Sequence, residues 1–114
     1  MRIEKIIELV KAKVVCGEEY LDCSIGSAFS SDLMSDILTL DTGDLMIITG
    51  LSNIQLIRTA EMVDVKFILI ARNKKATSEM IQLAKENSMV LLETPFSMFR
   101  VSGVLYMAGV KPVY

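Results

Sequence analysis

Histidine and tryptophan are absent from this chain of 114 residues, and cysteine and proline occur only twice each. Without histidine, the sequence lacks the commonest general base, the commonest metal ligand and every Ser-His or Cys-His catalytic pair. The two cysteines, Cys16 and Cys23, are separated by six residues, which is not the C-x-x-C spacing of a redox or zinc site. We therefore expect two free thiols, and the missing groups disfavour a catalytic role.

Long hydrophobic runs and an excess of positive charge are also missing. The apolar run at residues 67–71 is far shorter than the roughly 18–20 residues that cross a bilayer. Glu4, Glu8 and Lys11 interrupt the N-terminal segment, which argues against a secretory signal. The net charge of −2 and the isoelectric point of about 5.1 argue against nucleic acid as the main partner. We expect a cytoplasmic protein that does not bind membranes.

Apolar residues, in contrast, are abundant, at 52% of the chain with a mean hydropathy of +0.46. The length predicts one domain, residues 1–114, because domains cluster at roughly 100–150 residues. A sheet buried on both faces explains the high apolar content, and so does an apolar surface that forms an oligomer interface. We expect both together, and therefore a homodimer.

The spacing of the apolar residues predicts alternating helices and strands. Helical spacing predicts an amphipathic helix over residues 2–11, and apolar runs predict strands at 14–15, 22–29, 45–49, 66–71 and 89–92. Further helices are expected at 30–40, 52–63, 77–87 and 94–109, with Ser30 or Ser31, Ser52, Thr77 or Ser78, and Thr94-Pro95 at their starts. Asp41–Asp44 is typical of a turn. This alternation predicts an α/β fold with three layers, α/β/α, and a mostly parallel sheet of about four to five strands.

The carboxyl ends of the predicted strands define a candidate ligand-binding edge, because ligands of parallel sheets bind outside these ends. The residues placed there are mostly small and polar, and each group leads into a helix N-terminus that can hold an anionic or hydroxylated ligand. They are Ser30, Ser31, Asp32, Thr49, Ser52, Asn53, Arg72, Asn73 and Thr94. Helix capping alone accounts for the same residue types, so both interpretations stay open here.

Two smaller groups of charged residues suggest more specific chemistry. Asp32 and Asp36 lie one helical turn apart in the predicted helix, where paired carboxylates can bind a divalent cation or act as acid and base. The basic segment 72–75, with Thr77 and Ser78, can seat a phosphate at a helix N-terminus. Glycine-rich phosphate-binding motifs are missing, and solvated surface explains both groups better. The sequence predicts no metal site and no cofactor.

Several segments carry a family resemblance. Residues 26–36 read Gly-Ser-Ala-Phe-Ser-Ser-Asp-Leu-Met-Ser-Asp and residues 43–49 read Gly-Asp-Leu-Met-Ile-Ile-Thr, followed by Asn53-Ile54 and the strand–helix unit at 89–109. From Ser24 onward the chain thereby resembles the DRTGG domain, in particular its short stand-alone form. Where larger members carry Asp-Arg and Thr-Gly-Gly, this chain has Leu51-Ser52 and Ala71-Arg72-Asn73.

The resemblance implies a layered α/β fold similar to the N-terminal domain of HPr kinase/phosphorylase. It also implies a regulatory role, since such domains occur beside CBS pairs or in phosphotransacetylases. For stand-alone members it implies hydrogenase-type iron–sulfur proteins and anti-sigma-type kinases as partners.

Our leading hypothesis is a non-catalytic regulatory or protein-interaction domain that senses a small anionic ligand at the carboxyl edge of the sheet. One alternative is a small enzyme acting on a phosphorylated metabolite, in which Arg72 or Lys74 binds the phosphate and Asp32 transfers a proton. Another alternative is a component of a transcriptional or signalling regulator.

Overall fold

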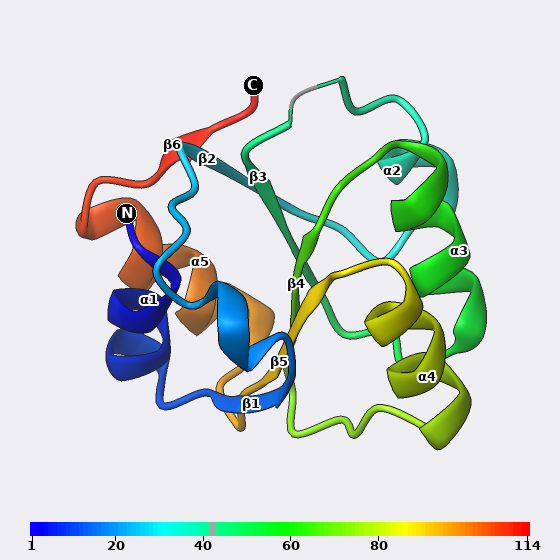
Figure 1. Ribbon diagram of the computed structural model, residues 1–114. Helices are drawn as coiled ribbons and strands as arrows, with labels where there is room; N and C mark the ends of the chain where they lie inside the picture. The colour runs from blue at the N-terminus through cyan, green and yellow to red at the C-terminus, as the bar shows by residue number, and fades with distance from the viewer. Residues whose placement is uncertain (42) are drawn as a thin grey trace.

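The computed structural model describes residues 1–41 and 43–114, and in it the chain forms a sheet between two layers of helices (Figure 1). The helices are α1 (Ile3–Val10), the 3-10 helix η1 (Glu18–Tyr20), α2 (Met34–Ile37), α3 (Ile54–Met62), α4 (Ser78–Glu86) and α5 (Met98–Met107). The strands are β1 (Lys13–Cys16), β2 (Ser27–Ser30), β3 (Leu45–Thr49), β4 (Phe67–Ile70), β5 (Val90–Glu93) and β6 (Lys111–Pro112). The predicted three-layer α/β/α architecture is confirmed, with six strands in the described ranges in place of the four to five expected.

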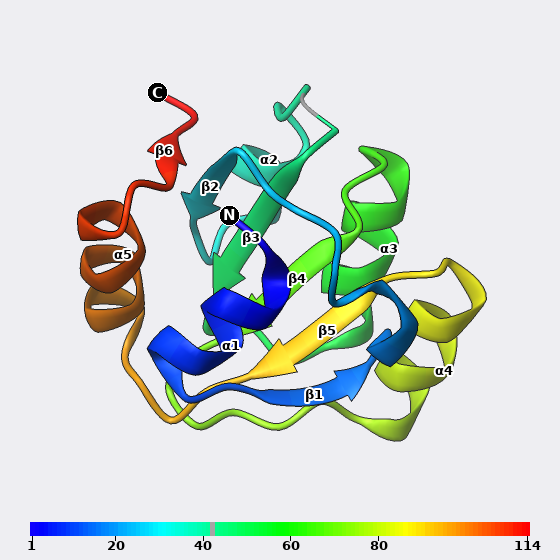
Figure 2. The same ribbon diagram turned by 60° about the vertical axis from the view of Figure 1, so that its left-hand side comes forward.

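The strands follow the order β1-β5-β4-β3-β2-β6. Strands β2 to β5 are parallel and lie next to one another in sequence order, β6 pairs in parallel with β2, and β1 pairs antiparallel with β5. Helices α2, α3 and α4 cover one face of the sheet, while α1 and α5 cover the other (Figure 2). The connections between consecutive strands from β2 to β5 therefore all run over the same face. The segment from β5 to β6, which contains α5, crosses the opposite face and reaches the far side of β2.

Strand β3 shows why the sequence contains continuous apolar runs. Its side chains alternate between the two faces, so Leu45 and Ile47 pack against the α2–α4 layer while Met46 and Ile48 pack against α1 and α5. All five residues of β3 are buried, because a parallel sheet covered on both faces has no solvated side. The predicted sheet buried on both faces is confirmed.

The predicted starts of three helices are wrong. Helix α2 is a single turn that begins at Met34, so Ser30, Ser31 and Asp32 lie outside it. Helix α3 is capped by Asn53, whose side chain accepts a hydrogen bond from the backbone N–H of Leu56 at 3.1 Å, and not by Ser52.

The start of α5 is the third that differs, because Ser97 caps this helix, three residues after the predicted start at Thr94. The remaining elements follow the predictions more closely, and Thr77, one of the two residues expected to begin α4, caps that helix. The strand predicted over 22–29 is shorter and ends one residue later, since β2 covers residues 27–30. Of the predicted turn at 41–44, Thr42 lies outside the described residues. No helix in the described part of the chain is both long and apolar enough to cross a membrane.

Candidate functional site

Asp32 connects the carboxyl ends of β2 and β3. It lies in the loop between β2 and α2, and its Oδ1 accepts hydrogen bonds from Thr49 Oγ1 at 2.9 Å and from the backbone N–H of Gly50 at 2.7 Å. The two contacts satisfy polar groups at the end of a fully buried strand, where an unpaired N–H would be costly. Asp32 therefore holds the loop after β2 against the end of β3.

Arg72 brings a third loop to the same place. Its guanidinium lies across Gly50, with Nη2 3.3 Å from the Gly50 carbonyl oxygen and 4.0 Å from Asp32 Oδ2. A Cβ on residue 50 would lie 2.4 Å from Arg72 Nε, so this approach requires glycine at that position. We call Asp32, Gly50 and Arg72 the edge cluster. Half of the Arg72 side chain (51%) remains exposed.

The backbone after β4 fixes where this guanidinium lies. Arg72 and Asn73 both adopt left-handed conformations, with φ of 62° and 59°, which are uncommon for residues other than glycine. Their N–H groups donate to the carbonyl oxygens of Phe96 and Thr94, at 2.8 and 3.0 Å. The segment after β5 thus stabilises the unusual backbone that directs Arg72 toward Gly50.

A second set of contacts closes the loop between β4 and α4. Glu93, at the end of β5, is buried; its Oε2 accepts a hydrogen bond from the N–H of Ala76 at 2.7 Å, and its Oε1 lies 3.8 Å from Lys75 Nζ. The Ser52 hydroxyl donates to the carbonyl oxygen of Lys75. Glu93, which is not among the predicted ligand-binding residues, therefore anchors this loop from inside the sheet edge.

The predicted site residues lie along one edge but do not all meet. Asp32, Thr49 and Arg72 belong to a single set of contacts, and Asn73 follows directly in the chain. Asn53 and Thr94 have structural roles, since Asn53 caps α3 and the buried Thr94 donates its hydroxyl proton to the Val10 carbonyl oxygen at 2.6 Å.

The two serines at the end of β2 make other contacts. Ser30 Oγ lies 2.7 Å from Ser102 Oγ of α5, and the Ser31 hydroxyl accepts from the N–H of Leu33 and donates to Asp36 at 3.4 Å. The predicted pairing of Asp32 and Asp36 on one helix face is wrong, because only Asp36 lies in α2. Over residues 1–41 and 43–114, no three His, Cys, Asp or Glu residues gather in a way that could hold a metal ion.

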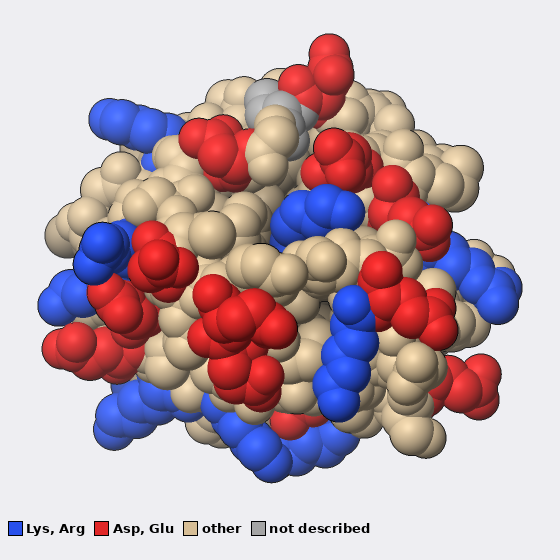
Figure 3. Space-filling model, viewed as in Figure 1, with Lys and Arg blue, Asp and Glu red and all other residues tan. Residues whose placement is uncertain are grey.

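Burial raises the pKa of the Cys16 thiol, which lies at the end of β1 and donates to the Met89 carbonyl oxygen at 3.6 Å. On the face seen in Figure 3, acidic and basic side chains alternate and neither sign forms a continuous stripe.

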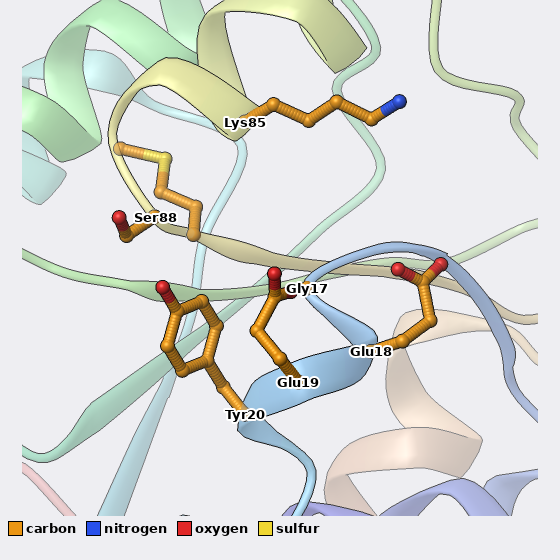
Figure 4. A pocket seen from close by; sticks show the side chains of 7 residues that line it. Gly17, Glu18, Glu19, Tyr20, Lys85 and Ser88 are labelled. Carbon is orange, nitrogen blue, oxygen red and sulfur yellow. The ribbon is translucent and has the colours of Figure 1, made fainter.

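Hollows also lie away from the edge cluster, at places that no local sequence signal predicts. One cavity of about 230 Å³ lies beside the amino end of β5, with Lys85 and Ser88 on one side and Glu18, Glu19 and Tyr20 on the other (Figure 4). A second cavity, of about 210 Å³, lies between α5 and the β2–β6 edge and is mainly apolar. Both join segments that are distant in sequence.

Comparisons with known proteins identify the fold. No family model matches the sequence, and no curated protein matches it. The fold is similar to a solved structure: the CBS and DRTGG domains of the regulatory region of Clostridium perfringens pyrophosphatase, complexed with the activator diadenosine tetraphosphate. The TM-score is 0.77 at 17% identity. The match covers 91% of this chain and 45% of the other, so this chain spans less than half the length of that regulatory region. At this identity the likeness establishes the α/β fold alone.

Proposed function

We propose that this chain is a non-catalytic regulatory domain of the DRTGG kind, which senses a small anionic ligand at the edge cluster. The observation that carries the proposal is the half-exposed guanidinium of Arg72, held by long contacts where the loops after β2, β3 and β4 meet. The similar fold of a regulatory region that was crystallised with a nucleotide activator supports the same role.

The chemistry of Arg72 suits an anion. Its contacts to Gly50 and Asp32 measure 3.3 and 4.0 Å, whereas charge-assisted hydrogen bonds between a guanidinium and a phosphate are shorter, at about 2.7–2.9 Å, and often bidentate. A phosphate-bearing ligand can therefore replace weak contacts with stronger ones. Asn73, exposed and next in sequence, offers an amide for a hydroxyl or phosphate oxygen.

Binding at this position would also be transmitted to the rest of the edge. Because the guanidinium lies across the loop after β3 and its own N–H bonds to the segment after β5, its movement changes the contacts among the loops. A small ligand can thus shift the relative stability of two loop arrangements, which is the requirement for a sensor.

Thermal-shift and calorimetric titrations test the proposal with ATP, diadenosine tetraphosphate and inorganic phosphate as probes. A ligand at 100 times its Kd adds about 2.7 kcal/mol to the free energy of unfolding. For 114 residues, this corresponds to a rise in Tm of roughly 10 °C. Arg72→Gln is expected to abolish the shift. The matched control, Arg58→Gln, alters an exposed arginine on α3 and should preserve it. An unchanged Tm of the wild-type chain with all probes, or full affinity in Arg72→Gln, contradicts the proposal.

A regulatory domain also requires a regulated protein. The resemblance to stand-alone DRTGG proteins suggests hydrogenase-type iron–sulfur proteins or anti-sigma-type kinases. Pull-down of purified candidates by the tagged chain, with and without the ligand identified above, tests each pair. A partner captured equally well by the wild-type chain and by Arg72→Gln, at every ligand concentration, would not be regulated through the edge cluster.

A further inference from the structure

The outer face of α5 is apolar. Across the described residues, seven large apolar side chains are substantially exposed, and three of them belong to this helix: Phe99 (90%), Tyr106 (67%) and Met107 (86%). On its inner side α5 buries Val101 and Leu105 against the sheet. A surface helix ordinarily has polar residues on its outward side, yet Arg100 is the sole charged residue in α5. Figure 2 shows this helix at one end of the molecule, with its outer side not covered by another element.

Gly103 lies in the middle of this face, because Phe99, Tyr106 and Met107 are four residues before it and three and four after it. Glycine inside a helix costs about 1 kcal/mol relative to alanine. Contacts within the chain do not require it, since a Cβ at residue 103 would meet no atom within 4 Å and its φ is not in the left-handed range. The result is a hollow flanked by large apolar side chains.

We infer that the outer face of α5 is the interface of a homodimer, in which two copies of α5 cross antiparallel at Gly103 on a twofold axis. This inference goes beyond the proposed ligand-sensing function and does not depend on it. A glycine at the crossing point lets two helices approach closely, as a larger residue would not.

The positions of the residues around Gly103 favour a second copy as the occupant. In an antiparallel twofold crossing, a residue before Gly103 lies opposite the residue equally far after it in the other copy. Phe99 then faces Met107, and Arg100 faces Tyr106. Methionine sulfur on an aromatic ring and a guanidinium on an aromatic ring are both favourable contacts. The face is therefore complementary to itself, as a twofold interface must be.

The exposed area is sufficient for such a pair. Two aromatic side chains that bury about 150–250 Å² each, together with Met107, supply roughly 400–600 Å² per copy. The total approaches or exceeds the lower limit of about 1,000 Å² expected for a specific interface. No acidic side chain on α5 opposes the contact. The predicted product is a dimer of moderate affinity, whose population depends on protein concentration.

Sedimentation velocity over a range of concentrations, on the full chain, tests the inference. The wild-type chain should be dimeric at high concentration. Gly103→Gln places a long side chain in the hollow while improving helix propensity, so its dimer Kd should rise at least about tenfold without loss of stability in urea. The control Met62→Gln removes an equally exposed apolar side chain from α3 and should leave the dimer intact.

A charge pair tests the register. Phe99→Lys and Met107→Glu should each weaken the dimer, and the double variant should restore it, because each lysine then faces a glutamate of the other copy. A monomeric wild-type chain at all concentrations, an unchanged dimer in Gly103→Gln, or dissociation in Met62→Gln each overturns the inference. Arg72→Gln should remain dimeric, so a failure of the ligand-sensing proposal is separable from a failure of this one.

Discussion

Replacing Asp32 by alanine tests whether this carboxylate connects β2 and β3. The substitution removes the acceptor of two hydrogen bonds, from Thr49 Oγ1 and from the N–H of Gly50. Hydrogen bonds to charged groups contribute about 1.5–3 kcal/mol each. The Asp32 side chain is 40% exposed, so water can replace part of this contribution. We therefore expect a loss of about 2 kcal/mol in the free energy of unfolding, measured as a lower urea midpoint at unchanged m-value.

The matched variant is Asp32→Asn, whose amide oxygen can still accept from Thr49 and Gly50. It should lose less than half as much stability as Asp32→Ala, because it removes only the charge. Backbone amide exchange gives a second measurement, since the Gly50 N–H should exchange much faster in Asp32→Ala than in Asp32→Asn. Equal stability of the two variants, or an unchanged exchange rate at Gly50, would refute the bridging role and assign Asp32 to solvated surface.

Two further predictions concern other parts of the fold. Gly17 has a φ of 91°, and a Cβ there would lie 2.6 Å from the Met89 carbonyl oxygen, so Gly17→Ala should cost about 2–4 kcal/mol in urea unfolding. Gly109→Ala, at a φ of 106° with nothing nearby, should cost only about 1–2 kcal/mol; equal losses would mean that the contact with Met89 contributes nothing. Because burial raises the pKa of the Cys16 thiol above its ordinary value of 9.0, the unfolded chain releases this proton first as the pH rises. The protonated Cys16 thiol therefore contributes fully to the free energy of unfolding below pH 9.0. Above that pH the free energy of unfolding falls, by up to about 1.4 kcal/mol per pH unit. Cys16→Ala should show a weaker decline over that range in the same measurement.

The parts of the fold that local sequence determines could be predicted. Strand β3 has its predicted bounds, 45–49. A short continuous apolar run predicts a strand buried on both faces, and this prediction needs no information about the segments that pack against it. Thr77, one of the two residues predicted to begin α4, caps that helix, because the groups that it bonds, at residue 80, lie within the same turn.

The wrong helix starts have a common cause. At each of the three wrong starts, a serine or threonine that was expected to begin the helix has its hydroxyl in a contact distant in sequence. Ser30 Oγ lies 2.7 Å from Ser102 Oγ, the Ser52 hydroxyl donates to the Lys75 carbonyl oxygen, and the Thr94 hydroxyl donates to the Val10 carbonyl oxygen. Local propensity cannot anticipate partners that are 23 to 84 residues away.

The candidate site was predictable in position but not in geometry. The carboxyl ends of parallel strands meet at one edge, so the list of polar residues follows from the topology alone. The approach of Arg72 to Gly50 depends on two consecutive left-handed residues that are held by the segment after β5. Such a conformation at arginine and asparagine has no clear signature in a single sequence.

The order of the strands has a consequence for folding during synthesis. Strands β2 to β5 can join the sheet one after another as they leave the ribosome, because each pairs with its predecessor. The outer edge of β2 differs, since its partner β6 lies at residues 111–112 and pairs at Ser27 and Ala28. Until that segment has been made, the nascent sheet exposes unpaired backbone groups along β2, which is a template for pairing with another chain. Chains shortened before residue 111 should therefore aggregate through this edge, even though they contain every other strand of the sheet.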